Sequence, residues 1–339
     1  FEYNTNTQPK FVNPTLYFRI WDQLVAHAVG GYDSQQTTRS FYLPLSAMNT
    51  TVPEGQAQRA YAKVENLSGE LFLNYDKEFG ADHRISAVLG AGYYRTSSSG
   101  FGVTAVNFFT DAFGYDNIGI ASDKEKAESR SWRSERTKLS QFVRLNYSFM
   151  DRYLLTFTAR RDGSSYFARN HKWGIFPSLS AAWRINQEPF LRDVTALSDL
   201  KVRVGYGTVG NENVLGTNSL SMYKSGYNYL FGDGMHSGLA LTQIENPNLK
   251  WETNYTFNLG LDFGFLNQRI SGTVEYFNRG VKDLLDFQVL PSNNAVGRVA
   301  ANIGETRSRG FEFSLHSRNQ ISVSYTQHRA PHTRQAIVC

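Results

Sequence analysis

Residues 254–265 read Asn-Tyr-Thr-Phe-Asn-Leu-Gly-Leu-Asp-Phe-Gly-Phe, so every odd position is large and apolar and every even position is small or polar. This period of two is that of a β-strand, whose side chains point alternately to opposite faces. A short turn at 266–268 and a second alternating stretch follow, which predicts a hairpin over 253–280. Its polar face carries Asp262, Glu275 and Arg279. Soluble cores rarely hold such charges, so the pattern favours a transmembrane β-barrel, which is apolar outside and polar inside.

The same alternation recurs along the chain and predicts about ten strands of the length that a tilted membrane strand needs. The fold class expected is therefore all-β, with an antiparallel and partial transmembrane barrel. The stretch at 15–28 is the weakest candidate. The alternating stretches are 15–28, 70–75, 84–93, 139–149, 153–160, 178–185, 200–206, 254–265, 269–276 and 311–316.

The connections between these stretches alternate in length. Short or compact connections lie at 76–82, 150–151, 186–198 and 266–268, and the longer ones lie at 98–137, 162–172, 211–252 and 280–299. Outer-membrane barrels have short periplasmic turns and longer extracellular loops. The parity therefore predicts that 138–149 and 253–265 run toward the periplasm, and that 152–161 and 269–279 run outward.

Composition agrees with such a barrel. Aromatic residues make up 14% of the 339 residues, with 28 Gly and only 4 Met. Mean hydropathy is −0.42, and no run of eighteen apolar residues exists, so no transmembrane helix is expected. The net charge of +5 is spread without a basic run, which argues against nucleic-acid binding. The single cysteine, Cys339, excludes an intrachain disulfide. Phe1-Glu2-Tyr3 has no signal-peptide character, so we expect a preceding segment to be missing.

Several segments together resemble one family. Leu73–Phe79 with His83 looks like a periplasmic turn of that family, and further segments follow in the same order. These are 176–185 with Glu188-Pro189-Phe190, 197–203 through Gly210-Asn211, 246–252, Asp283-Leu284-Leu285, Asn302-Ile303-Gly304 and Gly310-Phe311-Glu312. Over about residues 60–318 the chain resembles the C-terminal barrel half of SusC/RagA-like TonB-dependent outer-membrane transporters of Bacteroidota.

This resemblance implies a barrel of roughly 22 strands closed by a plug, with long extracellular loops. It also implies three partners besides outer-membrane lipid. These are the TonB complex, which acts through an N-terminal region, a SusD-like surface lipoprotein that forms a lid, and an oligosaccharide or peptide substrate. The protein would then lie in the cell outer membrane and need no cofactor.

The resemblance also divides the chain. Residues 1–68 are expected to be a barrel segment with an extracellular loop, and residues 69–318 the TonB-dependent receptor-like barrel. Beyond Arg318 the family pattern stops, and His328, Arg329, His332 and Arg334 stand in a stretch without Asp or Glu. Residues 319–339 are therefore expected to be an atypical tail that forms no native barrel strand.

Motifs of enzymes and metal sites are weak in this chain. Residues 205–210 fit G-x-G-x-x-G, but loop-forming residues follow where a dinucleotide fold needs a helix. Ser221–Lys224 fits S-x-x-K without its partner motifs. Asp111, Asp116 and Asp123 do not match a calcium loop, and the histidines lack metal-ligand spacing. We expect no enzyme, metal or cofactor.

Two sets of residues are candidates for contact with a solute or partner. Tyr223, Tyr227, Tyr229 and Phe231 lie in the longest outer loop region, where aromatic rings can stack on sugars or dock a partner. The alternative is that Tyr227 and Tyr229 continue a strand into the membrane girdle. The polar barrel face supplies the second set. These residues either touch the solute or only hydrate the lumen and pack against a plug. They are Arg144, Asn146, Arg160, Arg203, Asn254, Asn258, Asp262 and Glu275. Of these, Arg203 and Asp262 are the foremost candidates.

The function expected is active import of a nutrient, a glycan or peptide oligomer, by binding and gated passage. The alternative from another class is a passive porin-like barrel or an adhesin without energy coupling. A plug with a TonB-contacting segment in the parent protein would decide between the two. An enzyme is a third hypothesis, which needs acids and histidines grouped at one rim.

Overall fold

The computed structural model describes residues 1–47, 55–191, 194–212 and 220–318. The described chain is nearly all β, as predicted, with only two one-turn 3₁₀ segments, η1 (Ile118–Ile120) and η2 (Ile185–Gln187). None of the helical segments described there is long and apolar enough to cross a membrane. The predicted tail, 319–339, lies outside the described residues.

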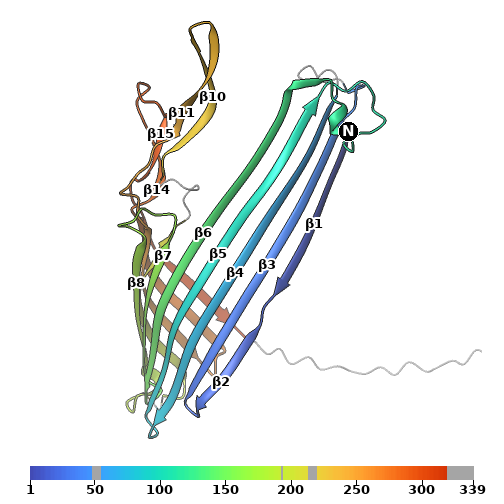
Figure 1. Cartoon of the computed structure of the whole chain (residues 1–339). Coiled ribbons are helices and arrows are strands. Elements are labelled where there is room, and N and C mark those ends of the chain that lie inside the picture. The colour runs from blue at the N-terminus through green and yellow to red at the C-terminus, as the bar shows by residue number, and fades with distance from the viewer. Residues whose placement is uncertain (48–54, 192–193, 213–219, 319–339) are drawn as a thin grey trace, which may run out of the picture.

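One twelve-stranded antiparallel sheet forms the body of the molecule and curves into an open trough (Figure 1). Its order is β1-β3-β4-β5-β6-β7-β8-β9-β12-β13-β16, and β2 also pairs with β3. Its strands are β1 (Glu2–Val12), β2 (Thr15–Trp21), β3 (Leu24–Leu43), β4 (Gln56–Phe79), β5 (His83–Val106), β6 (Asp123–Phe149), β7 (Tyr153–Ser164), β8 (Trp173–Arg184), β9 (Leu197–Asn211), β12 (Glu252–Phe265), β13 (Ile270–Lys282) and β16 (Thr306–Ser317).

The short turns gather at one end of this sheet. Backbone hydrogen bonds join neighbouring turns there, from Met150 N to Asp82 O at 2.6 Å and from Leu266 N to Ala196 O at 2.8 Å. Met150 and Asp151 both have positive φ, at 51° and 54°, as the tightest hairpin turns require. The long connections lie at the other end, so the predicted parity of loop lengths is confirmed.

Three strands are much longer than predicted. β4 and β5 have 24 residues each and β6 has 27, whereas a membrane strand needs about 9–11. The prediction that 98–137 is a loop was wrong, because only 107–122 lies between β5 and β6. Residues 96–104 are mostly Ser, Thr and Gly, so they lack an apolar alternation, yet their backbone remains paired with both β4 and β6. We call the part of β1 and β3–β6 beyond the membrane the extracellular extension.

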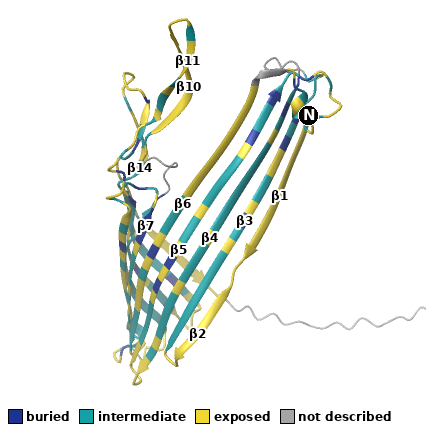
Figure 2. Cartoon of the chain, in the orientation of Figure 1, coloured by how far each residue is buried: buried dark blue, intermediate teal, exposed yellow. Residues whose placement is uncertain are grey.

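The prediction of a single, weak strand at 15–28 was also wrong. This segment is a hairpin in which β2 turns at Asp22-Gln23 into β3. Apolar residues on both sides of the turn conceal the reversal in the sequence. In Figure 2, β1 and β2 are exposed along their length, since they form one edge of the sheet.

Two small hairpins lie within the predicted long loops. β10 (Met222–Phe231) pairs with β11 (Gly234–Gln243), and β14 (Leu285–Val289) pairs with β15 (Arg298–Asn302). Each forms a sheet of its own. Figure 1 shows the β10–β11 hairpin rising well beyond the end of β8.

Buried apolar side chains form two clusters, both at the extracellular end. The first, here the cap core, is Tyr42, Ala57, Ala105, Phe108 and Ala121. The second, here the rim core, is Phe167, Phe176, Leu249, Trp251 and Ala300. Between the short turns and these clusters the sheet is a single layer.

Candidate functional site

One face of the sheet carries a continuous apolar surface. In an antiparallel pair, residues directly opposite share a face. The register joins Leu259 to Val204 on β9 and to Tyr276 on β13, and Tyr276 to Phe311 on β16. The alternation read from the sequence of 254–265 therefore extends across four strands, and we call this the outward face.

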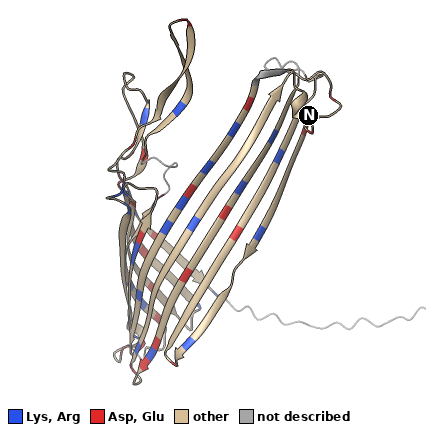
Figure 3. Cartoon of the chain, viewed as in Figure 1, with Lys and Arg blue, Asp and Glu red and all other residues tan. Residues whose placement is uncertain are grey.

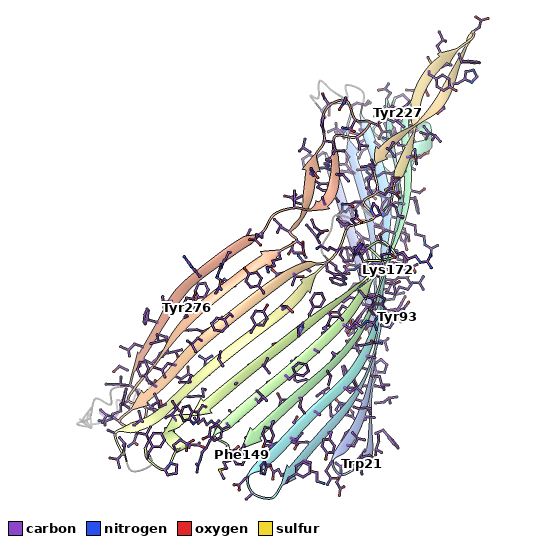
Figure 4. All side chains as sticks on the ribbon, turned by 90° about the vertical axis from the view of Figure 1, so that its left-hand side faces the viewer. Trp21, Tyr93, Phe149, Lys172, Tyr227 and Tyr276 are labelled. Atoms are coloured by element: carbon purple, nitrogen blue, oxygen red, sulfur yellow. The ribbon has the colours of Figure 1, made fainter. Side chains whose placement is uncertain are left out.

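Aromatic side chains mark two levels on the outward face. Trp183 and Trp173 lie ten residues apart on β8, and so do Phe265 and Tyr255 on β12. Ten residues of strand span about 33 Å, which at the usual tilt gives an apolar band about 25 Å tall. The Tyr153 and Trp183 rings stack at 6.2 Å beside the short turns. Figure 4 shows Phe149 at that end and Tyr93 and Lys172 farther along the strands.

The opposite, inward face holds a cluster of four charged residues, here the luminal charge cluster: Lys201, Arg203, Asp262 and Glu275. Arg203 Nε and Nη2 donate to the two Asp262 oxygens at 2.8 and 2.9 Å. Lys201 Nζ lies 3.0 Å from Asp262, and Arg203 Nη2 lies 3.4 Å from Glu275. The two foremost luminal candidates are thus partners of each other, and the cluster is formally neutral.

The other predicted luminal residues lie on the same face but in separate contacts. Asn146 accepts a hydrogen bond from Thr156 at 2.9 Å. Arg160 donates from Nε to both Asp162 oxygens at 2.8 and 2.7 Å. Asn258 faces a hollow beside the charge cluster, and its buried Oδ1 has no hydrogen-bond partner among the described residues. Figure 3 shows the charged residues distributed along the strands.

The aromatic loop residues lie on the β10–β11 hairpin. Tyr227, Tyr229 and Phe231 are opposite Gly238, His236 and Gly234, so they share one face. Tyr223 lies on the other face, because a bulge at Gly226, with φ of 101°, inserts a residue into β10 and reverses the alternation. The structure therefore brings three of the four predicted residues together.

These three aromatic residues are widely exposed, at 54% for Tyr227, 53% for Tyr229 and 73% for Phe231. The His236 ring lies 5.9 Å from that of Tyr229 and 6.1 Å from that of Phe231. Among the described strands β10 pairs only with β11. It therefore does not continue a barrel strand, and Figure 4 shows Tyr227 on the projecting hairpin.

Sequence reasoning missed the rim core, from which this hairpin projects. Leu249 is completely buried, and Trp251 Nε1 donates to Lys172 O at 3.0 Å. The Asn302 side chain bonds both the N and the O of Lys250, at 3.0 and 2.9 Å, and donates to Asp283 O at 2.8 Å. Four of the segments that carry the family resemblance meet here: 176–185, 246–252, 283–285 and 302–304. Large apolar residues within an otherwise polar loop were the signal that could have found this core.

The described structure does not place the enzyme-like motifs in the contexts that an enzyme site requires. Residues 205–210 lie within β9, and residues 213–219 lie outside the described residues. Ser221–Lys224 leads into β10. Across the described parts of the chain, no three His, Cys, Asp or Glu residues are grouped as metal ligands.

An apolar outward face between aromatic levels, a polar inward face and short turns at one end define a wall of an outer-membrane β-barrel. The chain belongs to the TonB dependent receptor-like β-barrel family, whose model matches residues 2–335. This match is wider than the span 60–318 that carries the quoted motifs.

Curated relatives and solved structures agree with this assignment. TonB-dependent receptor P3 of Formosa agariphila is 34% identical over 309 residues, which is 91% of this chain and 30% of the relative. TonB-dependent receptor SusC of Bacteroides thetaiotaomicron is 34% identical over 330 residues, 95% of this chain and 32% of the relative. The RagAB peptide transporter superposes with a TM-score of 0.82 at 25% identity, covering 93% of this chain and 34% of that one. The chain spans about a third of the length of these curated relatives.

Proposed function

We propose that this chain is part of the barrel wall of a SusC-like transporter that imports an oligomeric nutrient across the outer membrane. The observation that carries the proposal is the family match over a sheet with a membrane-facing side and a polar inward side. β1 and β16 are unpaired edges in the described sheet. Lipid does not tolerate an open edge, which supports a larger closed barrel in the whole protein.

The proposal divides the chain as the sequence suggests. Residues 1–68 and 69–318 contribute to one barrel. The luminal charge cluster stabilises the wall and offers charged groups to whatever occupies the lumen, whether a plug or a passing solute. In this proposal transport is binding and gated passage, without bond chemistry.

The β10–β11 hairpin is proposed as a contact for a SusD-like surface lipoprotein. Its support is the aromatic face of Tyr227, Tyr229 and Phe231, held beyond the rim core. Exposed aromatic rings with polar neighbours are typical of the centres of protein interfaces. The RagAB neighbour is a peptide transporter, and an oligosaccharide or a peptide is the proposed class of substrate.

Replacing 224–240 by Asn-Gly in the full-length protein tests the proposed contact, because Tyr223 and Leu241 are register partners at the base of the hairpin. We expect normal membrane insertion, with loss of lid capture in a pull-down and reduced uptake. Leu230→Ser with Met235→Ser, on the opposite face of the hairpin, is the matched control and should keep lid binding.

Energy coupling separates active import from the passive alternative. Dissipating the proton-motive force should abolish uptake by a TonB-dependent importer and leave a porin-like barrel unaffected. Normal lid binding and uptake after removal of the hairpin would refute its assigned role, without bearing on the import mechanism.

A further inference from the structure

A hollow of about 500 Å³ opens on the extracellular extension. Small residues of β4, Ala60 and Ala62, line its floor. Its sides carry aromatic rings and two guanidinium groups: Tyr3 on β1, Arg39 and Phe41 on β3, and Arg130 and Trp132 on β6. None of these residues belongs to the predicted sites.

The hollow lies on the inward face of the sheet. The register runs from Arg39 through Ala60 and Gly102 to Arg130, so these four residues share one face. On β4 the even positions, which include Ala60, face inward together with Asn74, whereas Leu71 and Leu73 face outward. The cap core covers the outward face at this height with residues of the 107–122 loop.

This position is well outside the lipid. Tyr93, at the upper aromatic level, lies nine residues before Gly102 on β5, which is about 30 Å along the strand. The β-ladders on both sides of β3, β4 and β5 are unbroken here. The floor therefore has no free backbone groups, and a ligand is held by side chains.

The arginines of the hollow differ in their ion-pair partners from the arginines on the outward face of the same strands. Outward-facing arginines have carboxylate partners: Arg59 with Asp116 at 4.0 Å, and Arg95 with Glu135 at 2.6 Å. Arg39 and Arg130 are exposed and form an ion pair with none of the described residues. Among the described residues, these two cations on the lumen side thus have no ion-pair partner, and the lining of the hollow holds no carboxylate.

Two glycines of β5 leave room for the Trp132 and Arg130 side chains beside the floor. A Cβ at Gly100 would collide with the Trp132 ring, and one at Gly102 would lie 3.4 Å from Arg130 Nε. The indole and the guanidinium thus lie close over glycines at one side of the hollow. Trp132 remains 41% exposed and Tyr3 61%.

We propose that this hollow binds an acidic oligosaccharide, with Arg39 and Arg130 holding carboxylate or sulfate groups and Trp132 and Tyr3 packing on sugar rings. The proposal rests on the proposed import function and names the substrate class. Guanidinium groups bind such anions bidentately, and aromatic faces offer large rigid apolar areas to sugar C–H groups. A peptide that binds by strand addition needs an unpaired strand, and the floor strand β4 is paired with β3 on one side and β5 on the other.

Binding of oligogalacturonate to the full-length purified protein tests this assignment. The double variant Arg39→Gln/Arg130→Gln should weaken binding at least tenfold, as expected from the loss of charge-assisted hydrogen bonds. Trp132→Ala should weaken it as well, and added salt should weaken wild-type binding. The matched control Arg59→Gln/Arg133→Gln removes the same charge from the outward face and should leave affinity unchanged.

Three results would overturn the proposal: no binding of oligogalacturonate by the wild type, equal loss in the control variant, or unchanged affinity in Arg39→Gln/Arg130→Gln. Tighter binding of hexaglutamate than of oligogalacturonate would assign the hollow to acidic peptides instead. Energy-dependent uptake of any oligomer, measured in parallel, tests the import function separately. If the hollow variants bind oligogalacturonate normally while uptake persists, the proposal for the hollow fails and the import function stands.

Discussion

Arg203 on β9 and Asp262 on β12 form a two-point ion pair at 2.8 and 2.9 Å, diagonally across a register in which Asp262 lies opposite Lys201. Their neighbours Lys201 and Glu275 extend the pair into a neutral group of four charges. Removing the charge of Arg203 leaves the Asp262 carboxylate without its two-point partner, and removing that of Asp262 leaves the Arg203 guanidinium without its own.

A double-mutant cycle should measure this coupling. Arg203→Gln and Asp262→Asn should each destabilise the reconstituted barrel, and the double variant should lose less than the sum. The coupling should be about 1 kcal/mol, because the pair is only partly buried. Denaturant unfolding in detergent gives the four stabilities. Additive effects would show that the pair contributes nothing of its own.

Leu261→Arg should prevent or weaken insertion into lipid. Leu261 lies on the outward face, between the aromatic levels of Tyr255 and Phe265 on β12. Arginine near the centre of the bilayer costs about 2–4 kcal/mol. Folding into lipid vesicles measures the cost. Thr273→Arg, on the inward face opposite Asp262, is the control, and an equal penalty there would contradict the assignment of the faces.

Leu249→Ala should loosen the rim core. Leu249 is completely buried among Phe167, Phe176 and Trp251, and truncating a buried leucine costs about 2–5 kcal/mol. Hydrogen exchange should speed up in 165–172, β14 and β15 while the strands near the short turns stay protected. Leu239→Ala, at a 73% exposed position, should change nothing. Faster exchange throughout the sheet would mean that the core is not a local unit.

Glu188 should make the periplasmic end sensitive to acid. The Trp183 indole and the Tyr153 hydroxyl, at 2.9 and 2.7 Å, donate to its carboxylate and lower its pKa from 4.5. Because the pKa of Glu188 is lower in the folded state, its ionised carboxylate stabilises the fold at pH values above the ordinary pKa. That stability is lost as the pH falls through the lowered pKa. Thermal unfolding between pH 6 and 2 should show this loss in the wild type and a flatter profile in Glu188→Gln. Parallel profiles would exclude the contribution.

The alternation at 254–265 sufficed to predict the two faces of the sheet, because a period of two survives wherever lipid contacts one face. Outside the lipid that constraint disappears. Residues 96–104 of β5 therefore carry no apolar alternation, and their strand was missed. The single inserted residue at Gly226 likewise moved Tyr223 to the opposite face of its hairpin, since a bulge changes register without changing composition.

The candidate residues show the same limit. Arg203 and Asp262 could be placed on the polar face from periodicity, but their mutual pairing depends on the β9–β12 register, and 40 residues separate these strands. The hollow between Arg39 and Arg130 joins four strands. No local sequence pattern predicts it, because its floor consists of the alanines Ala60 and Ala62, which any strand can contain.

The unequal lengths of the strands give the described wall a high side and a low side. β4 and β5 have 24 residues and β7 and β8 have 12, a difference of about 40 Å along the strand. The extracellular rim of the described wall is therefore oblique. In the proposed importer, a solute that arrives over the low side would meet the inner surface of the tall side before it reaches the membrane level, and capture and passage would take place at different heights along the same strands.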